Sequence, residues 1–201
     1  GIPLLRVSDD GQGIPPDEVE LAFRRHATSK LASLDDLASI SSLGFRGEAL
    51  ASIAAVAEVA MLTRTPDRPL GMLLHLKDGT VLEKGERGCP PGTTVTVRNL
   101  FSGLPARRKF LRPAATESRR VTDVVARNCL AYPEVQFLLF NDGRLTLQSS
   151  GDGQLSTVVA SLYGSQVARA MAPVEAKDAS LVIQGLVSPP SEARAGRQAI
   201  N

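Results

Sequence analysis

The sequence is poor in the features that mark several classes of protein. It has only two cysteines, Cys89 and Cys129, which lie far apart and form no CxxC pair. This usage indicates neither a zinc site nor a disulfide framework, and it favours a reducing, cytosolic setting. No segment approaches the roughly 18 uninterrupted apolar residues that a membrane-spanning helix needs. The N-terminal residues also lack the basic-then-apolar pattern of a secretion signal, so no membrane partner is expected.

The chain also lacks a marked excess of charge of either sign. Lys and Arg number 23 and Asp and Glu number 21, which gives a formal net charge of +2. This charge is too small to indicate a nucleic-acid-binding protein by itself, so any basic surface must be local. With 201 residues, 43% hydrophobic and 22% charged, the composition fits one ordinary soluble domain, or one domain and part of another.

The apolar pattern predicts a chain that mixes helices and strands. A short strand is indicated around Leu4 to Val7, and Pro15 and Pro16 are expected to open a helix that runs through Phe23. Apolar residues at helical spacing predict a mostly buried helix from 48 to about 58. Strand-like runs separated by Pro/Gly turns then predict an antiparallel meander; these runs cover residues 59–65, 72–76, 81–84 and 94–97.

The second half of the chain continues this pattern. Residues 105–113 are expected to form a basic turn or short helix, and the next helix is expected to carry an apolar face of Val121, Val124, Val125 and Cys129. Asn141-Asp142-Gly143 predicts a hairpin with a turn of the primed type. Residues 149–153 indicate a linker, beyond which a helix near 154–164 and strands near 173 and 181–187 begin a further domain.

The first polar motif, Asp9-Asp10-Gly11-Gln12-Gly13-Ile14, follows the first predicted strand. A simple strand-ending turn accounts for it as readily as a binding site does. An ionised carboxylate only accepts hydrogen bonds, so Asp9 could take the exocyclic amine of adenine, whereas guanine would present an oxygen there. The glycines would let a base or ribose lie against bare backbone.

Two further motifs could bind phosphate. Thr28, Ser29 and Lys30 lie in the long segment 26–47 and offer two hydroxyls and an ammonium group, although a solvated polar loop also explains them. The segment 44–47 (Gly-Phe-Arg-Gly) precedes a predicted helix start, where backbone N–H groups and the helix dipole favour an anion. Its alternative is a helix entry that needs a left-handed residue. The Walker A pattern GxxxxGK[ST] is absent from the sequence.

A dense basic run occupies 105–112 and contains Arg107, Arg108, Lys109 and Arg112. Such a run is most often a solvated face. It could also contact DNA phosphates or pin neighbouring carboxylates.

Five segments in this order resemble the N-terminal ATPase region of MutL-type DNA mismatch repair proteins: DDGQGI (9–14), RHATSK (25–30), SLGFRGEALASI (42–53), GTTVTVRNLF (92–101) and PARRKFL (105–111). This family belongs to the GHKL superfamily, with gyrase B, large ATP-dependent chaperones and histidine kinases. The DxGxGI and GTxV patterns are shared across the superfamily, whereas RHATSK, GFRGEAL and PARRKFL together are specific to the MutL-like branch. A type II topoisomerase subunit is disfavoured for the same reason.

The resemblance implies an α+β fold, the two-layer Bergerat (GHKL ATPase) sandwich, with a mostly antiparallel mixed sheet and helices on one face. Residues 1–150 would be the ATP-binding domain without its N-terminal base-bearing helix. Residues 151–201 would be the truncated beginning of a second, ribosomal-protein-like α/β domain.

The resemblance also assigns roles to residues of the motifs. Asp9 would accept the adenine amine, Gly11 and Gly13 would shape the pocket, and Thr93 would support adenine through water. Thr28, Ser29 and Lys30 would belong to a lid that orders when ATP binds. A second phosphate-contacting loop would comprise Leu43, Gly44, Phe45, Arg46, Gly47, Glu48, Ala49 and Leu50.

One expected motif does not occur in the sequence. In the family, a helix before the first strand bears a general-base Glu and, four residues later, an Asn that holds Mg²⁺. No Glu of this chain has an Asn at that spacing, so both groups are expected upstream of Gly1, and a phosphate-binding lysine is expected beyond residue 201. The chain is therefore expected to be an internal piece of an ATPase that uses ATP and Mg²⁺, and to be inactive by itself.

The implied function is that of a weak ATPase that acts as a conformational switch in DNA mismatch repair. ATP binding and slow hydrolysis would control dimerisation of two N-terminal regions and coordinate DNA, a mismatch-recognition protein and other repair proteins. In a prokaryote the protein would be cytoplasmic and associated with the nucleoid. The alternative is a DNA-binding or scaffolding module with a vestigial nucleotide pocket.

Overall fold

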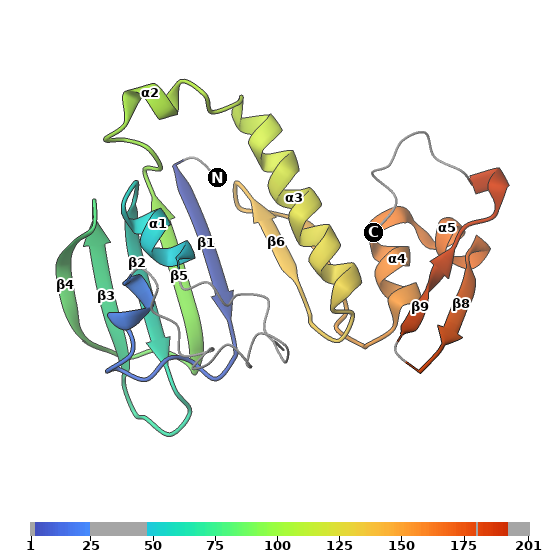
Figure 1. Ribbon diagram of the computed structural model, residues 1–201, viewed down its shortest axis with the longest axis horizontal. Helices are drawn as coiled ribbons and strands as arrows, with labels where there is room; N and C mark the ends of the chain where they lie inside the picture. Colours follow the sequence, from blue (N-terminus) through green and yellow to red (C-terminus); the bar gives the residue numbers. More distant parts are fainter. Residues whose placement is uncertain (1–2, 25–47, 180, 193–201) are drawn as a thin grey trace. The chain divides into compact units, whose positions relative to one another are not determined.

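The computed structural model describes residues 3–24, 48–179 and 181–192 (Figure 1). The chain divides into two compact units, Gly1–Ala114 and Ala115–Asn201. The predicted domain boundary between residues 150 and 151 stays a prediction.

A five-stranded antiparallel sheet forms the first unit, with the strand order β1-β5-β2-β3-β4. Strands β2, β3 and β4 make the predicted meander. The prediction was wrong for β5, which lies between β1 and β2 instead of beyond β4. The physical reason is that Val95 and Val97 of β5 pack against the core, which a central strand permits. The strands are β1 (Leu4–Asp9), β2 (Glu58–Arg64), β3 (Gly71–Lys77), β4 (Thr80–Arg87) and β5 (Gly92–Arg98).

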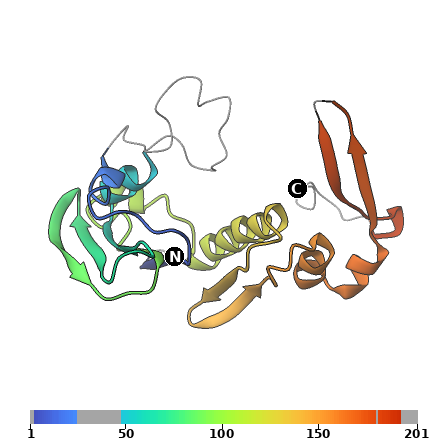
Figure 2. The same ribbon diagram turned by 90° about the horizontal axis from the view of Figure 1, so that it is seen from below.

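The helical layer covers one face of this sheet, as Figures 1 and 2 show from two directions. Among the described residues it contains the 3-10 helix η1 (Leu21–Phe23) and the helix α1 (Ala49–Ala54). Phe23 and Leu50 pack against the buried residues Val19, Met61 and Leu74. The expected α+β architecture, with helices on one side of an antiparallel sheet, is confirmed.

Both predicted helices of this layer are shorter than expected. After Pro15 and Pro16 the chain makes turns and then a single 3-10 turn, which ends where the backbone of Arg24 becomes extended. Helix α1 ends at Ala54, since strand β2 already begins at Glu58 and pairs with β3 there.

Apolar side chains form rows across the strands on the helix-facing side. Val95 of β5 lies opposite Met61 of β2, and Val97 lies opposite Val59. Met61 and Val59 are fully buried. On β4, Lys84 donates a 2.7 Å bond to Glu20 near η1, and this bond lowers the pKa of the Glu20 carboxyl. The core therefore lies between the sheet and its helices.

The first unit ends in a short basic helix, as predicted. After β5 the backbone takes positive φ at Asn99 and Phe101, and helix α2 (Pro105–Arg108) follows with Pro at its start. Phe101 N donates to Val56 O at 2.8 Å, which ties this turn to the end of the helical layer.

The second unit contains helices and two separate hairpins. Its core cluster is Cys129, Leu147 and Val158, and burial raises the pKa of the Cys129 thiol. Asp142 and Gly143 both have positive φ, which confirms the predicted primed turn. Helix α5 was not predicted. The elements are α3 (Ala114–Ala131), β6 (Leu138–Asn141), β7 (Arg144–Gln148), α4 (Leu155–Tyr163), α5 (Ser165–Ala170), β8 (Ala172–Lys177), β9 (Val182–Val187) and η3 (Pro190–Glu192).

One expectation about this unit was wrong. Val124 is 58% exposed and does not share the buried face of Cys129. Ser149, the first residue of the predicted linker, is buried, donates to Val135 O and accepts from Phe137 N, whereas the linker itself stays a prediction. No helix in the described part of the chain is both long and apolar enough to span a membrane.

Candidate functional site

A row of three polar side chains ends the helix-facing side of the sheet. In the strand register Asp9 of β1 lies opposite Thr93 of β5, and Thr93 lies opposite Thr63 of β2. Residues directly opposite one another in antiparallel strands point to the same face. The carboxylate and two hydroxyls thus stand side by side, one row beyond the apolar row that contains Val95 and Met61.

The Asp9 side chain is held in place by backbone donors. Its Oδ1 accepts hydrogen bonds from Gly11 N at 3.0 Å and from Thr93 N at 3.2 Å. Both bonds use the same oxygen, and none of the described residues donates to Oδ2. Asp9 is exposed. The loop and strand β5 therefore orient the carboxylate while leaving one oxygen to accept a hydrogen bond from a ligand.

Thr63 is the residue of this row that the sequence did not reveal. Its side chain is 1% exposed. Its hydroxyl oxygen accepts from Ile14 N at 2.9 Å, lies 3.1 Å from Gly92 O and lies 2.9 Å from Thr93 Oγ1. Threonine is common in strands, so no local signal separates this one from its neighbours. Thr63 links the loop after β1, strand β2 and the start of β5.

At the end of the sheet that bears the polar row, glycines occupy positions where a side chain would collide with neighbouring backbone. Gly13 has φ +70, and a Cβ there would overlap the backbone of Arg64. Gly92 has φ +112, and a Cβ there would overlap Asp9 O. Only glycine combines such φ values with so close an approach. At Gly11 a Cβ would lie 3.0 Å from Asp9 Oδ1, so a side chain there would crowd the oriented carboxylate.

The last three residues of the predicted phosphate loop lie at the start of helix α1. Glu48 precedes the helix and its O accepts from Ser52 N at 2.9 Å, while Ala49 and Leu50 form the first turn. Leu50 packs into the core against Met61 and Leu74, so this helix start is anchored to the sheet. The other predicted phosphate contacts lie outside the described residues; these are Thr28, Ser29, Lys30, Leu43, Gly44, Phe45, Arg46 and Gly47.

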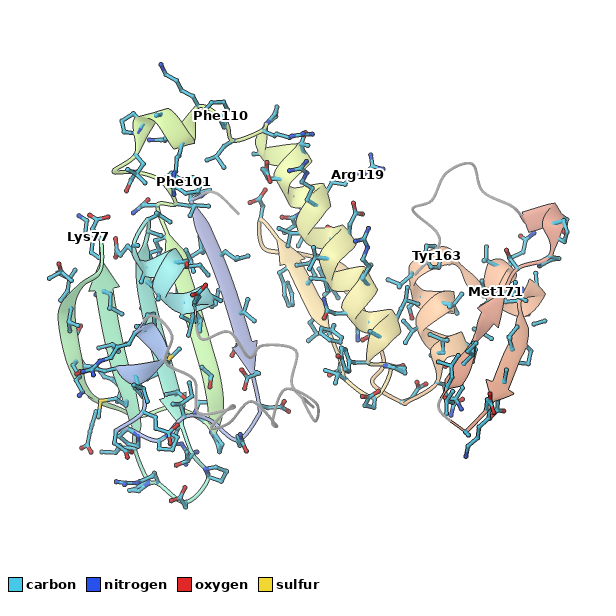
Figure 3. The ribbon with its side chains drawn as sticks, viewed as in Figure 1. Lys77, Phe101, Phe110, Arg119, Tyr163 and Met171 are labelled. Carbon is cyan, nitrogen blue, oxygen red and sulfur yellow. The ribbon has the colours of Figure 1, made fainter. Side chains whose placement is uncertain are left out.

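The predicted DNA contacts do not lie near the polar row. Arg107, Arg108, Lys109 and Arg112 follow the opposite end of β5, on and after helix α2. We call residues 104–112 the basic arm. Phe110 lies within it, is 87% exposed and is labelled in Figure 3. The sequence contains no Asp or Glu from 87 to 116. The arm thus combines several cations with an exposed aromatic ring.

The part of the chain that the structure describes contains no cluster of metal-ligating side chains. Within residues 3–24, 48–179 and 181–192, no three His, Cys, Asp or Glu side chains are placed to hold a metal ion together. The residues described here therefore do not fit Mg²⁺ as a ligand set of their own.

Comparison with known sequences gives one consistent result. The chain is 46% identical over 198 residues to the DNA mismatch repair protein MutL of Limosilactobacillus fermentum, covering 98% of this chain and 30% of that protein. It is 44% identical to MutL of Desulforudis audaxviator, covering 98% of this chain and 35% of that protein. The chain thus spans about a third of the length of the curated relatives it matches. No family model matches it.

Solved structures agree with this result. The Aquifex aeolicus MutL ATPase domain complexed with ADP has a TM-score of 0.68 at 31% identity, covering 87% of this chain and 60% of that chain. The N-terminal domain of a DNA repair protein has a TM-score of 0.73 at 26% identity, covering 94% of this chain and 59% of that chain.

Proposed function

We propose, because this chain belongs to the family of MutL-type DNA mismatch repair proteins, that its polar row binds the adenine base of ATP. The observation that carries the proposal is the oriented Asp9 carboxylate. Two backbone N–H groups fix its Oδ1 and leave Oδ2 to accept the amine of adenine. A solved relative is complexed with ADP, which supports nucleotide binding by this chain.

The surrounding backbone suits a flat ligand. Gly11 and Gly13 carry no side chain that would shield Asp9, and Thr93 adds a hydroxyl beside it. We assign the phosphates of ATP to Lys30 and its neighbours Thr28 and Ser29, and to the loop 43–50. The anchored start of α1 supports that second assignment, because Leu50 fixes where the loop ends.

In the whole protein, ATP binding and slow hydrolysis would switch the association of two N-terminal regions. The lid containing Lys30 would order on ATP and contribute to this dimer. The nucleotide state would then coordinate DNA, a mismatch-recognition protein and other repair proteins. In a prokaryote we place this activity in the cytoplasm, with the nucleoid.

Hydrolysis would need groups that these residues do not supply. No Glu in the chain is followed at the fourth position by Asn, and the described residues hold no metal-ligand cluster. In-line attack on a phosphate needs an activated water and charge stabilisation at the phosphate. We therefore expect the parent protein to be an ATPase and these 201 residues to bind without turnover; magnesium-dependent phosphate release by them would contradict this.

A second candidate function rests on the basic arm. Phe110 is 87% exposed among Arg107, Arg108 and Lys109. Cations neutralise phosphates, and an exposed aromatic ring can stack on an unpaired base. The alternative function is thus a DNA-binding or scaffolding module that is indifferent to nucleotide. The intact Asp9 geometry argues against a vestigial pocket, so we take the arm as an addition to the nucleotide site.

Calorimetric titration of ADP into Asp9→Asn and Asp10→Asn variants tests the nucleotide site. Both substitutions remove one carboxylate charge at neighbouring exposed positions, but only Asp9 takes part in the described bonds. Loss of one charge-assisted hydrogen bond should weaken ADP binding by Asp9→Asn about 10- to 150-fold. Asp10→Asn should bind like the wild type. Equal affinities for all three proteins would contradict the proposal.

A further inference from the structure

The hydroxyl of Thr63 has enough neighbours to fix the direction of each of its hydrogen bonds. A threonine hydroxyl has one proton to donate and two lone pairs to accept with. Ile14 N can only donate to it, and Gly92 O can only accept from it. The Thr93 hydroxyl, at 2.9 Å, could take either role.

Two proton arrangements are possible. In the first, Thr63 donates to Gly92 O and accepts from both Ile14 N and Thr93 Oγ1, so its full capacity is used. In the second, Thr63 donates to Thr93 Oγ1, and Gly92 O loses its side-chain donor. The first arrangement makes one more hydrogen bond within the protein. At a side chain that is 1% exposed, satisfying every polar group decides between the two.

The first arrangement has a consequence for Thr93. Its only proton is directed at Thr63, so the Thr93 hydroxyl offers only lone pairs to a ligand. The neighbouring Asp9 carboxylate, when ionised, also only accepts. The open side of the row is therefore an acceptor surface, and it pairs with N–H groups and with waters that donate to it.

We propose that Thr63 is a positioning residue that sets base selectivity: it keeps Thr93 an acceptor, so the row favours a 6-aminopurine over a 6-oxopurine. This rests on the proposed nucleotide site, and it assigns to a buried residue a role in choosing the base. A 6-oxopurine would bring an oxygen to side chains that have no proton to give it, which a row built from acceptors disfavours. Thr63 touches no ligand itself.

The test compares ADP with inosine diphosphate, whose base carries an oxygen in place of the amine. We expect Thr63→Val to release the Thr93 proton, which can then rotate to meet that oxygen. The ratio of the affinity for ADP to the affinity for inosine diphosphate should therefore fall about tenfold, which is the effect of one hydrogen bond to a ligand. Thr63→Ser keeps the hydroxyl and should restore the wild-type ratio, which a merely structural role of the methyl group would not do.

Thr96→Val is the matched control. Thr96 is also a buried threonine of this sheet, 8% exposed, but it lies on the other face, where it accepts from Arg6 Nε at 3.3 Å. Its substitution should leave the affinity ratio unchanged. A similar fall in Thr96→Val and Thr63→Val would mean that the ratio reports general damage, and it would overturn the inference.

A second variant covers the case in which Thr63→Val folds too poorly for titration. Thr93→Val removes the oriented hydroxyl and should lower the same ratio, whereas an unchanged ratio would overturn the inference. An unchanged ratio in well-folded Thr63→Val would also overturn it. A wild-type protein that binds neither nucleotide would instead contradict the proposed function, which separates the two failures.

Discussion

The two ends of the five-stranded sheet differ in which residues adopt positive φ. Each end needs residues at positive φ where strands turn or loops begin. At the end that bears Asp9 these residues are Gly13 and Gly92, and a Cβ at either would overlap neighbouring backbone. At the other end they include Asp78 and Asn99, which carry side chains. Figure 3 labels Lys77 and Phe101 at this second end.

This difference separates glycines that serve a turn from glycines that serve close packing. Gly79 has φ +79, nearly that of Gly13, yet a Cβ there would meet nothing within 4 Å. At the Asp9 end the loop after β1 lies against β2, so bare backbone is a condition of assembling the site. At the other end a Cβ at Gly79 would point into open space, and Asp78 and Asn99 carry side chains at positive φ.

The largest expected effect comes from adding a methyl group at each end. Gly13→Ala should lower the free energy of unfolding by about 3 to 5 kcal/mol, because it combines left-handed strain with overlap on the Arg64 backbone. Gly79→Ala at a similar φ should cost about 1 to 2 kcal/mol, the strain alone. Urea denaturation of both variants measures the difference. Equal losses would mean that the close packing at Gly13 contributes nothing.

An intermediate effect is expected from the basic arm, which follows the other end of the sheet. Replacing Arg107, Arg108 and Lys109 by Ala should reduce the slope of log affinity for single-stranded DNA against log salt by about 2, since each phosphate contact contributes about 0.7. ADP affinity should not change, because the arm and the polar row lie at opposite ends of β5.

The salt titration, measured by fluorescence anisotropy of a labelled oligonucleotide, distinguishes the outcomes for the arm. Phe110→Ala should weaken binding and leave the salt slope intact, because stacking releases no counterions. If the triple variant keeps the wild-type slope, the arm is a solvated surface and the DNA contacts lie elsewhere.

The smallest effect is expected one residue from the polar row, on the other face. Thr94 makes a 2.7 Å hydrogen bond with Ser8, and this bond is exposed. Thr94→Val should cost about 0.5 to 1 kcal/mol in unfolding free energy. It should leave ADP affinity unchanged, although Thr93→Val should weaken it. Parallel thermal denaturation and calorimetry would show this; a loss of ADP affinity in Thr94→Val would mean that the two faces are not independent.

Local patterns predicted the strands well, whereas the binding roles of the site residues stay predictions. Alternating apolar residues located β2, β3 and β5 to within a few residues, and Asp9 and Thr93 do lie side by side. The order of strands was not predictable in the same way. Whether β5 pairs with β4 or lies between β1 and β2 depends on which neighbours bury Val95 and Val97. The spacing of apolar residues along the sequence does not predict these neighbours.

Thr63, the member of the row that was not predicted, shows a different limit of prediction from sequence. Thr63 is one threonine in a strand, and its importance comes from Ile14, Gly92 and Thr93, which approach it only in the folded chain. The helix expected after Pro15 failed for a local reason instead. Proline suits a first helical turn, but the segment after the two prolines forms turns and one 3-10 turn, and the extended backbone of Arg24 ends it.

The central position of β5 also determines when the site can exist during folding. Asp9 and Thr93 are joined by a hydrogen bond across 84 positions of the chain. Strands β2, β3 and β4 pair in sequence order with short connections, so they can form early. Strand β1 can join the sheet only when β5 is present, because β5 is its neighbour. Contacts so distant in sequence close slowly. A nascent chain therefore acquires its acceptor row only after strand β5 has been synthesised, and ligand binding would report that the first unit is complete.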